Sequence, residues 1–148
     1  MKRLLLVIAL LAVSAARAAE VFVCEADRTL AFVYDGATQK WDGRQFPGDG
    51  RTWIVREVTQ EERGVMGLPE QAFVVQLDGV AQIEHVCRNG FSLRGDLHCE
   101  RTRQSMFNMS NATLRYLFVR HDGYWTRYGK RLGEEAPVGM EIGRCKAL

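Results

Sequence analysis

His98 and Glu100 are the first residues whose types and spacing suit chemistry. They stand two positions apart, so in a β-strand both side chains point to one face, with Asp96 beside them and Cys99 on the other face. A histidine beside carboxylates can ligate a divalent metal or transfer protons. His98 and Glu100 are therefore the candidate catalytic residues of a metal-dependent hydrolase.

The competing interpretation of this segment is a polar, solvent-facing strand. A polar strand requires no second histidine near His98, whereas a metal or catalytic site is expected to have one. His85 and His121 are both distant from His98 in the sequence. The serine at residue 92 fails the G-x-S-x-G pattern because Arg94 takes the place of the last glycine. The chain has no phosphate-binding loop, no dinucleotide-binding fingerprint and no C-x-x-C pair. These features favour a protein that is not an enzyme, and they indicate no cofactor and no metal site.

A second group of residues suits binding rather than catalysis. Arginine and large aromatic side chains dominate the energetics of many protein interfaces, and both types gather near the C-terminus. Since aromatic residues also fill the cores of β proteins, one face of the segment 124–128 is expected to be core and the other exposed. The predicted binding residues are Arg115, Arg120, Tyr124, Trp125 and Arg127.

Charge is distributed unevenly along the chain. Residues 19–87 contain 6 basic and 12 acidic residues, whereas residues 88–132 contain 9 basic and 3 acidic ones. The simpler interpretation is that the two halves interleave in one sheet system, and the alternative is a basic patch for an anionic partner. The expected partner is an envelope or extracellular protein or an anionic polymer. A cationic nucleic-acid binder is not indicated, because the chain without its first 18 residues carries about as many acidic as basic groups.

The first 18 residues have the layout of a secretory signal peptide. Lys2 and Arg3 precede an apolar run over residues 4–13, and small residues end in Ala16-Arg17-Ala18. The run is too short to span a bilayer, which takes about 20 residues. The sequence therefore predicts a signal peptide over 1–18 and a single exported domain over 19–148, located in the periplasm or outside a bacterial cell.

The four cysteines fit that compartment. In an oxidising environment an even number of cysteines indicates disulfides, and four allow three pairings. Cys87 and Cys99 flank a short turn region, while Cys24 and Cys145 lie near the ends of the exported domain. We favour the pairs Cys87–Cys99 and Cys24–Cys145.

Turn signals recur about every ten residues, which predicts an all-β fold: an antiparallel sandwich or barrel of about 8–11 short strands. Asp78-Gly79 is the clearest hairpin turn, between strands over 72–77 and 80–87. A second hairpin is expected to join 91–94 to 97–100, and a third to join 106–109 to 113–120. Thr59 and Glu62 have the form of a capping box and predict a short helical turn. Further strands are expected at 29–34, 52–58, 124–128 and 140–145.

Parts of the last third of the chain resemble a family of small exported bacterial proteins of unknown function. The matching pieces are Phe107-Asn108, Thr113-Leu114-Arg115-Tyr116, Gly123-Tyr124-Trp125 and Glu141-Ile142-Gly143-Arg144-Cys145, whereas Glu134-Glu135-Ala136-Pro137 departs from the family's Asp-Thr-Pro form. The resemblance implies export and carries no activity. Periplasmic lysozyme inhibitors, which are small disulfide-bonded β-barrels, are similar in expected architecture only. The predicted function is thus a non-enzymatic periplasmic or secreted binding domain, with a metal-dependent hydrolase or a lysozyme-inhibitor-like protein as alternatives.

Overall fold

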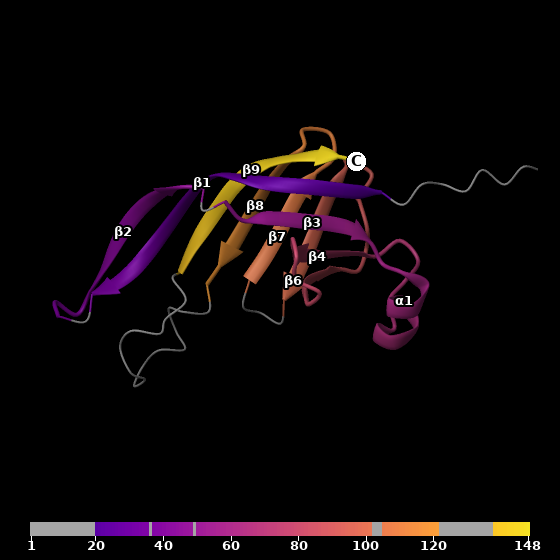
Figure 1. Ribbon diagram of the computed structural model, residues 1–148, viewed down its shortest axis with the longest axis horizontal. Coiled ribbons are helices and arrows are strands. Elements are labelled where there is room, and N and C mark those ends of the chain that lie inside the picture. The colour runs from indigo at the N-terminus through magenta and orange to yellow at the C-terminus, as the bar shows by residue number, and fades with distance from the viewer. Residues whose placement is uncertain (1–19, 36, 49, 102–104, 122–137) are drawn as a thin grey trace, which may run out of the picture.

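The computed structural model describes residues 20–35, 37–48, 50–101, 105–121 and 138–148. Within them the chain is all-β, with one short helix and an antiparallel sheet of nine strands (Figure 1). The predicted signal peptide and the predicted strand over 124–128 lie outside the described residues. In chain order the elements are β1 (Val21–Asp35), β2 (Lys40–Pro47), β3 (Thr52–Glu57), α1 (Gln60–Met66), β4 (Phe73–Leu77), β5 (Ile83–Cys87), β6 (Asp96–Arg101), β7 (Ser105–Ser110), β8 (Arg115–Arg120) and β9 (Val138–Ala147).

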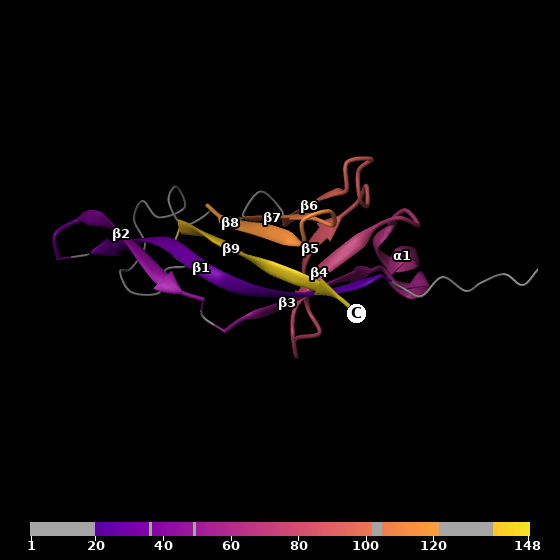
Figure 2. The ribbon, with the colours of Figure 1, turned by 90° about the horizontal axis from the view of Figure 1, so that it is seen from above.

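Eight of these strands close into a barrel. The strand order is β2-β1-β3-β4-β5-β6-β7-β8-β9, and β1 also pairs with β9, so the sheet joins its own end. Strand β1 is long enough to have two neighbours on one side: residues 21–25 pair with β3, and residues 28–35 pair with β2. The β1–β2 hairpin therefore projects from one end of the barrel, while α1 lies at the other end (Figures 1 and 2). The prediction of an antiparallel sandwich or barrel is confirmed as a barrel.

Both predicted disulfides are present. Cys24 and Cys145 stand directly opposite each other on β1 and β9, the pair of strands that closes the barrel. Cys87–Cys99 joins β5 to β6, whose ladder contains only the pair Val86 and Glu100. The two bridges thus hold the closing seam and the seam with the shortest ladder.

The barrel interior is filled by side chains that alternate along each strand. In β6 the buried residues are Leu97 and Cys99, while Asp96, His98 and Glu100 face outward. Aromatic rings dominate the centre, where Phe107 stacks on Tyr116 at 5.1 Å between ring centroids. Other buried members of the core include Phe22, Trp53, Val55, Phe73, Val75, Met109 and Phe118. This alternation fixes which side chains of each strand are available on the surface.

Local chemistry explains where the predicted elements begin and end. Thr59 and Glu62 form the capping box of α1, and Gly67, at φ 61°, ends the helix. The hairpin after Leu77 is confirmed, but its turn is longer than two residues, because β5 begins only at Ile83 and its register shifts against β4.

The predicted strand over 91–94 is wrong. The Ser92 hydroxyl accepts hydrogen bonds from the backbone N–H groups of Arg94 and Asp96, at 3.3 and 3.1 Å, and holds this stretch as a turn. Strand β6 consequently forms its hairpin with β7, not with residues 91–94.

Candidate binding surface

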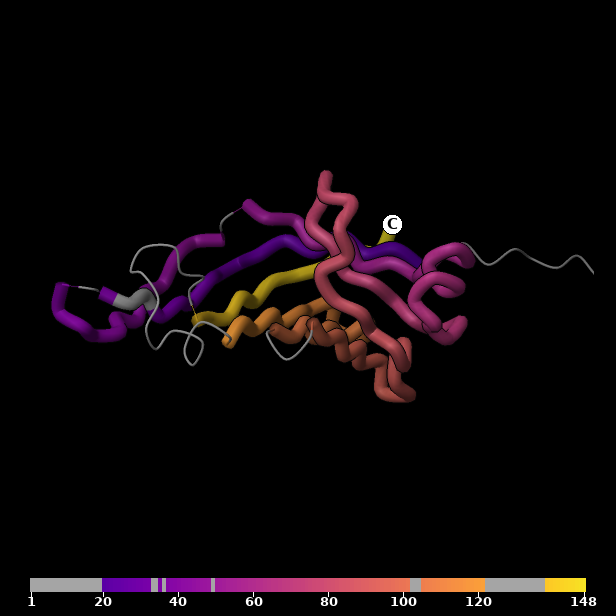
Figure 3. The backbone as a smooth tube through the Cα atoms, turned by 90° about the horizontal axis from the view of Figure 1, so that it is seen from below, coloured from indigo at the N-terminus to yellow at the C-terminus, as the bar shows by residue number. Residues whose placement is uncertain are grey.

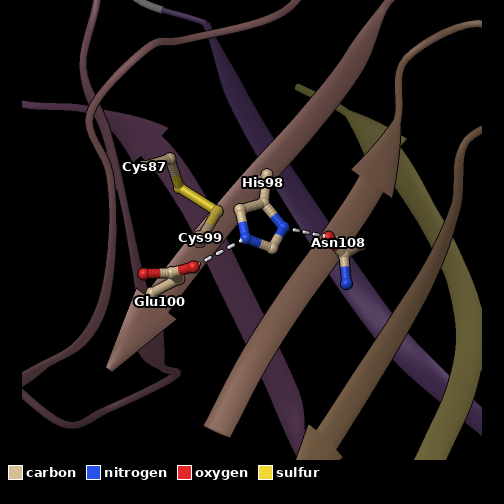
Figure 4. The surroundings of a disulfide bond; sticks show 5 residues. All are labelled: Cys87, His98, Cys99, Glu100 and Asn108. Carbon is tan, nitrogen blue, oxygen red and sulfur yellow. Dashed lines mark hydrogen bonds and ion pairs between the residues drawn. A yellow bond between two sulfur atoms is a disulfide. The ribbon is translucent and has the colours of Figure 1, made fainter. Parts of the chain in front are cut away.

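The His98 cluster lies on the outer face of β6, next to the Cys87–Cys99 bridge (Figure 4). His98 Nδ1 lies 2.5 Å from Asn108 Oδ1, and Nε2 lies 3.0 Å from Glu100 Oε1. Two oxygen acceptors suit an imidazolium that donates from both nitrogens. These contacts, first that with Asn108 and then that with Glu100, raise the pKa of His98. An imidazolium has no free nitrogen lone pair. In this state His98 can therefore neither ligate a metal ion nor act as a general base.

A surface cleft of about 510 Å³ lies beside His98, between β5 and β6, lined by Ile83, Glu84, Val86, Arg88, Asn89, His98, Glu100 and Arg101. Both carboxylates that line the cleft are occupied, because Glu84 is ion-paired with Arg101 and Glu100 contacts His98. Among the residues that the structure describes, no group of three histidine, cysteine, aspartate or glutamate side chains is placed to hold a metal ion. The cleft therefore gives the hydrolase hypothesis no support.

Glu141 is a buried carboxylate that was not predicted from the sequence. It is 1% exposed and accepts hydrogen bonds from Trp53 Nε1 at 2.8 Å and from the Tyr116 hydroxyl at 2.6 Å. Arg51 Nη2 lies 3.2 Å away as its cation. Glu141 is four residues before Cys145 in one strand, so the two share a face, and a buried cysteine could have shown that this glutamate points inward. Since its hydrogen bonds satisfy it, we interpret Glu141 as a structural residue.

The interior also contains His85, which is 2% exposed. Its Nε2 lies 2.8 Å from the Ser105 hydroxyl, and its ring packs among Trp53, Phe107 and Phe118. Burial lowers the pKa of His85 to about 4, and the charges of two arginines, Arg101 and Arg120, act in the same direction. It is enclosed with Ser105, which is only 7% exposed, so this pair also belongs to the core.

The predicted binding residues do not form one cluster. Tyr124, Trp125 and Arg127 lie outside the part of the chain that the structure describes. Arg115 and Arg120 occupy the two ends of β8 and alternate to opposite faces. Arg120 lies on the side of the buried residues, with its guanidinium 5.7 Å from the centroid of the Phe118 ring.

Arg115 lies on the outer face, directly opposite Arg144 of β9. Arg144 is held by Asp27, whose carboxylate accepts from Nη2 at 2.9 Å and from Nε at 3.1 Å. Asp27 stands where a bulge interrupts the pairing of β1 with β9. The pKa of Asp27 is lowered, first by the hydrogen bond from Arg144 and also by the charges of Arg144, Arg28 and Arg115. Within the described residues the side chain of Arg115 makes no hydrogen bond or ion pair of its own. The Asp27 carboxylate is thus the acidic group that interacts with Arg144, Arg28 and Arg115.

Hollows flank Arg144 on the surface. One, of about 520 Å³, is lined by Asp27, Arg115, Tyr116, Ile142, Gly143 and Arg144. The other, of about 390 Å³, is lined by Val23, Glu25, Ala26, Asp27, Arg144, Cys145 and Lys146. The arginine pair is therefore beside open space that a ligand group can enter.

An apolar area adjoins the arginine pair on the same outer face. Leu30 and Phe32 on β1 are 40% and 47% exposed, and Met140 and Ile142 on β9 are 44% and 49% exposed. Leu117 and Val119 continue this area onto β8, since they stand opposite Ile142 and Met140. We refer to the outer surface of these three strands, with its apolar and basic parts, as the β1–β9–β8 face. Strands β1 and β9 lie side by side in every view (Figures 1, 2 and 3).

The three strands of this face share one polarity. Outward residues run from Phe32 and Leu30 to Arg28 on β1, from Met140 and Ile142 to Arg144 and Lys146 on β9, and from Val119 and Leu117 to Arg115 on β8. The register aligns these series, because Leu30 pairs with Met140 and Arg28 with Ile142. The alternation of β9 was visible in the sequence, but its alignment with β1 and β8 depends on barrel closure.

No protein-family model, curated protein or solved structure matches the chain. None of the helices in the described residues is long and apolar enough to cross a membrane.

Proposed function

We propose that this protein is an exported, non-enzymatic binding domain that binds an anionic component of the cell envelope or of the extracellular medium through the β1–β9–β8 face. The observation that carries the proposal is the cross-strand pair of Arg115 and Arg144, with Asp27 as its bound carboxylate.

Arg115 and Arg144 place like charges on neighbouring strands. Two cations directly opposite each other on a sheet repel and destabilise the pairing. Asp27 offsets this for Arg144, with the side chains 44% and 75% exposed, while Arg115 lacks an acceptor of its own among the described residues. Arginine binds carboxylate, sulfate or phosphate oxygens through two parallel N–H donors. An anionic group in the adjoining hollow would therefore relieve the repulsion and gain charge-assisted hydrogen bonds.

Export is supported by the two disulfides, because such bridges persist in oxidising compartments. The predicted signal peptide and the resemblance to small exported bacterial proteins agree with this assignment. The lysozyme-inhibitor alternative depends on architecture alone, and no contact in the structure favours it.

The test is binding of the exported domain to fluorescent dextran sulfate, a soluble anionic polymer, measured by anisotropy at low and high salt. Arg115→Ala is expected to weaken binding about tenfold, the factor that corresponds to one charge-assisted hydrogen bond of about 1.4 kcal/mol. Arg88→Ala is the matched control, since Arg88 is an exposed arginine in the cleft between β5 and β6. Equal affinities for the two variants would show that the arginine pair is not the binding site.

A further inference from the structure

We infer that the β1–β9–β8 face docks on an anionic lipid surface, with its apolar side chains among the acyl chains and its arginines at the phosphates. This inference rests on the proposed function, and it names the partner. It follows from the apolar half of the face, which a purely polar polymer does not use.

The three strands of this face are aligned with their apolar ends together. Apolar outward residues occupy one half of each strand. The other half carries cations on β8 and β9, and Arg28 with the acidic Asp27 and Glu25 on β1, so an apolar area adjoins a charged one. Surfaces that combine an apolar area with neighbouring lysine or arginine lie in the membrane interface, where lipid tails accept the first and anionic headgroups attract the second.

The apolar half of the face is open and mostly aliphatic. Leu30, Phe32, Met140 and Ile142 are each 40–49% exposed, and most of them are flexible or aliphatic. Interfaces with proteins concentrate their energy in tryptophan, tyrosine and arginine anchors that fill pockets. The two hollows described above both lie around Arg144, and Ile142 alone of these four apolar side chains lines one of them. An open aliphatic surface suits a fluid hydrocarbon layer better than a shaped protein partner.

The charge of the other half of the face suits anionic headgroups. Among the residues that the structure describes, the cations at this end of the face are Arg28, Arg115, Arg144 and Lys146, and the acidic residues are Glu25 and Asp27, which leaves an excess of positive charge. The face is also long enough to contact acyl chains and headgroups together. Met140 in its apolar part and Arg144 in its basic part are four residues apart, about 13 Å along a strand.

The experiment is co-sedimentation of the exported domain with vesicles of phosphatidylcholine alone or mixed with phosphatidylglycerol. The wild-type domain is expected to bind the mixed vesicles and to bind the neutral ones at least tenfold more weakly. Arg115→Ala is expected to lower affinity for mixed vesicles about fivefold, close to the contribution of one cation near an anionic surface, whereas Arg88→Ala leaves it unchanged. Asp27→Asn, which removes the internal competitor for Arg144, is expected to strengthen binding.

The apolar half is tested with Met140→Ser combined with Ile142→Ser. Its control is Val65→Ser combined with Leu93→Ser, since these residues are 82% and 109% exposed in α1 and in the turn before β6. The first pair is expected to lose most vesicle binding while keeping wild-type affinity for dextran sulfate, and the control pair is expected to lose neither. Thermal melting of each variant confirms that it folds.

The outcomes separate this inference from the proposed function. Dextran sulfate binding that depends on Arg115, without vesicle binding, would overturn the lipid inference and leave an anionic polymer or acidic protein as the partner. Vesicle binding that survives both serine changes would also overturn it. Binding to neither probe would refute the proposed function together with the inference.

Discussion

His85 makes the stability of the barrel sensitive to acid. The folded protein encloses this histidine as a neutral ring, with desolvation as the main reason why its pKa falls from 6.5 to about 4. The charged groups that act on it are Arg101 on β6 and Arg120 on β8, and both oppose its protonation. The unfolded chain, in contrast, takes up a proton near pH 6.5.

The sign of the effect follows from proton linkage. Between pH 6.5 and about 4 the unfolded state binds more protons at this position than the folded state, so stability decreases as the pH falls through this range. At about 1.4 kcal/mol for each tenfold change in proton affinity, the full loss is about 3 kcal/mol, of which about 2 kcal/mol appears between pH 7 and pH 5. Well above pH 6.5, where the histidine is neutral in both states, His85 contributes no pH dependence.

The perturbation is His85→Phe, which keeps an aromatic ring beside Trp53 and Phe118 and removes the titration. The assay is urea unfolding, followed by tryptophan fluorescence, to which the buried Trp53 contributes, at several values between pH 4 and pH 7. The wild-type protein is expected to lose about 2 kcal/mol more than the variant between pH 7 and pH 5. Ser105→Ala removes the hydrogen bond to the ring but keeps the histidine, so it should retain the wild-type pH dependence. Parallel curves for wild type and His85→Phe would refute the reasoning.

His98 has the opposite sign and provides a second control. Asn108 and Glu100 raise its folded pKa, so the stability it contributes is present below pH 6.5 and is lost as the pH rises through the folded pKa. His98→Gln should therefore make the acid loss of the protein steeper, while His85→Phe makes it shallower.

Three further predictions concern the covalent and packing constraints of the barrel. Replacing both cysteines of Cys87–Cys99 by serine should cost about 3 kcal/mol in urea unfolding and replacing those of Cys24–Cys145 about 5 kcal/mol, because the bridges span 12 and 121 residues; equal losses would contradict this explanation. Glu141→Ala should destabilise by about 3 kcal/mol and Glu141→Gln by clearly less, since only the amide still offers an oxygen to the tryptophan and tyrosine donors; the two variants are compared by melting temperature. Gly143→Ala should cost about 3 kcal/mol because its Cβ would clash with the backbone oxygen of Glu25 and lie 2.5 Å from the Tyr116 ring, whereas Gly64→Ala, with nothing within 4 Å, should be neutral or stabilising in the same melting assay.

Local patterns predicted those parts of the fold that depend on near neighbours. Thr59 and Glu62 predicted the helix, and Asp78-Gly79 predicted a hairpin. The positions of the cysteines indicated their pairing. The strand predicted over 91–94 is absent because the Ser92 hydroxyl accepts hydrogen bonds from backbone N–H groups that follow it. Strand propensity, which scores residue types, does not include this competition with sheet formation.

The candidate surface depends on long-range register, which no local pattern contains. Arg115 was identified from the sequence, but its neighbour Arg144 is 29 positions away and meets it only because β8 and β9 pair. Asp27 reaches them through the closure of β1 on β9. His98 and Glu100 were correctly placed on one face, and it was Asn108, from the neighbouring strand β7, that determined the state of the ring.

The positions of the disulfides divide the molecule in a way that bears on proteolysis. Each bridge joins one residue of the segment 21–87, which forms β1 to β5, to one residue of the segment 96–147, which forms β6 to β9. The connection between these segments includes Arg88 and Arg94, both exposed. A single tryptic cut there would produce two polypeptides that stay covalently attached at opposite seams. The nicked protein would run as one band on a non-reducing gel and as two after reduction, so a protease acting in this turn would change the number of chains without releasing either half.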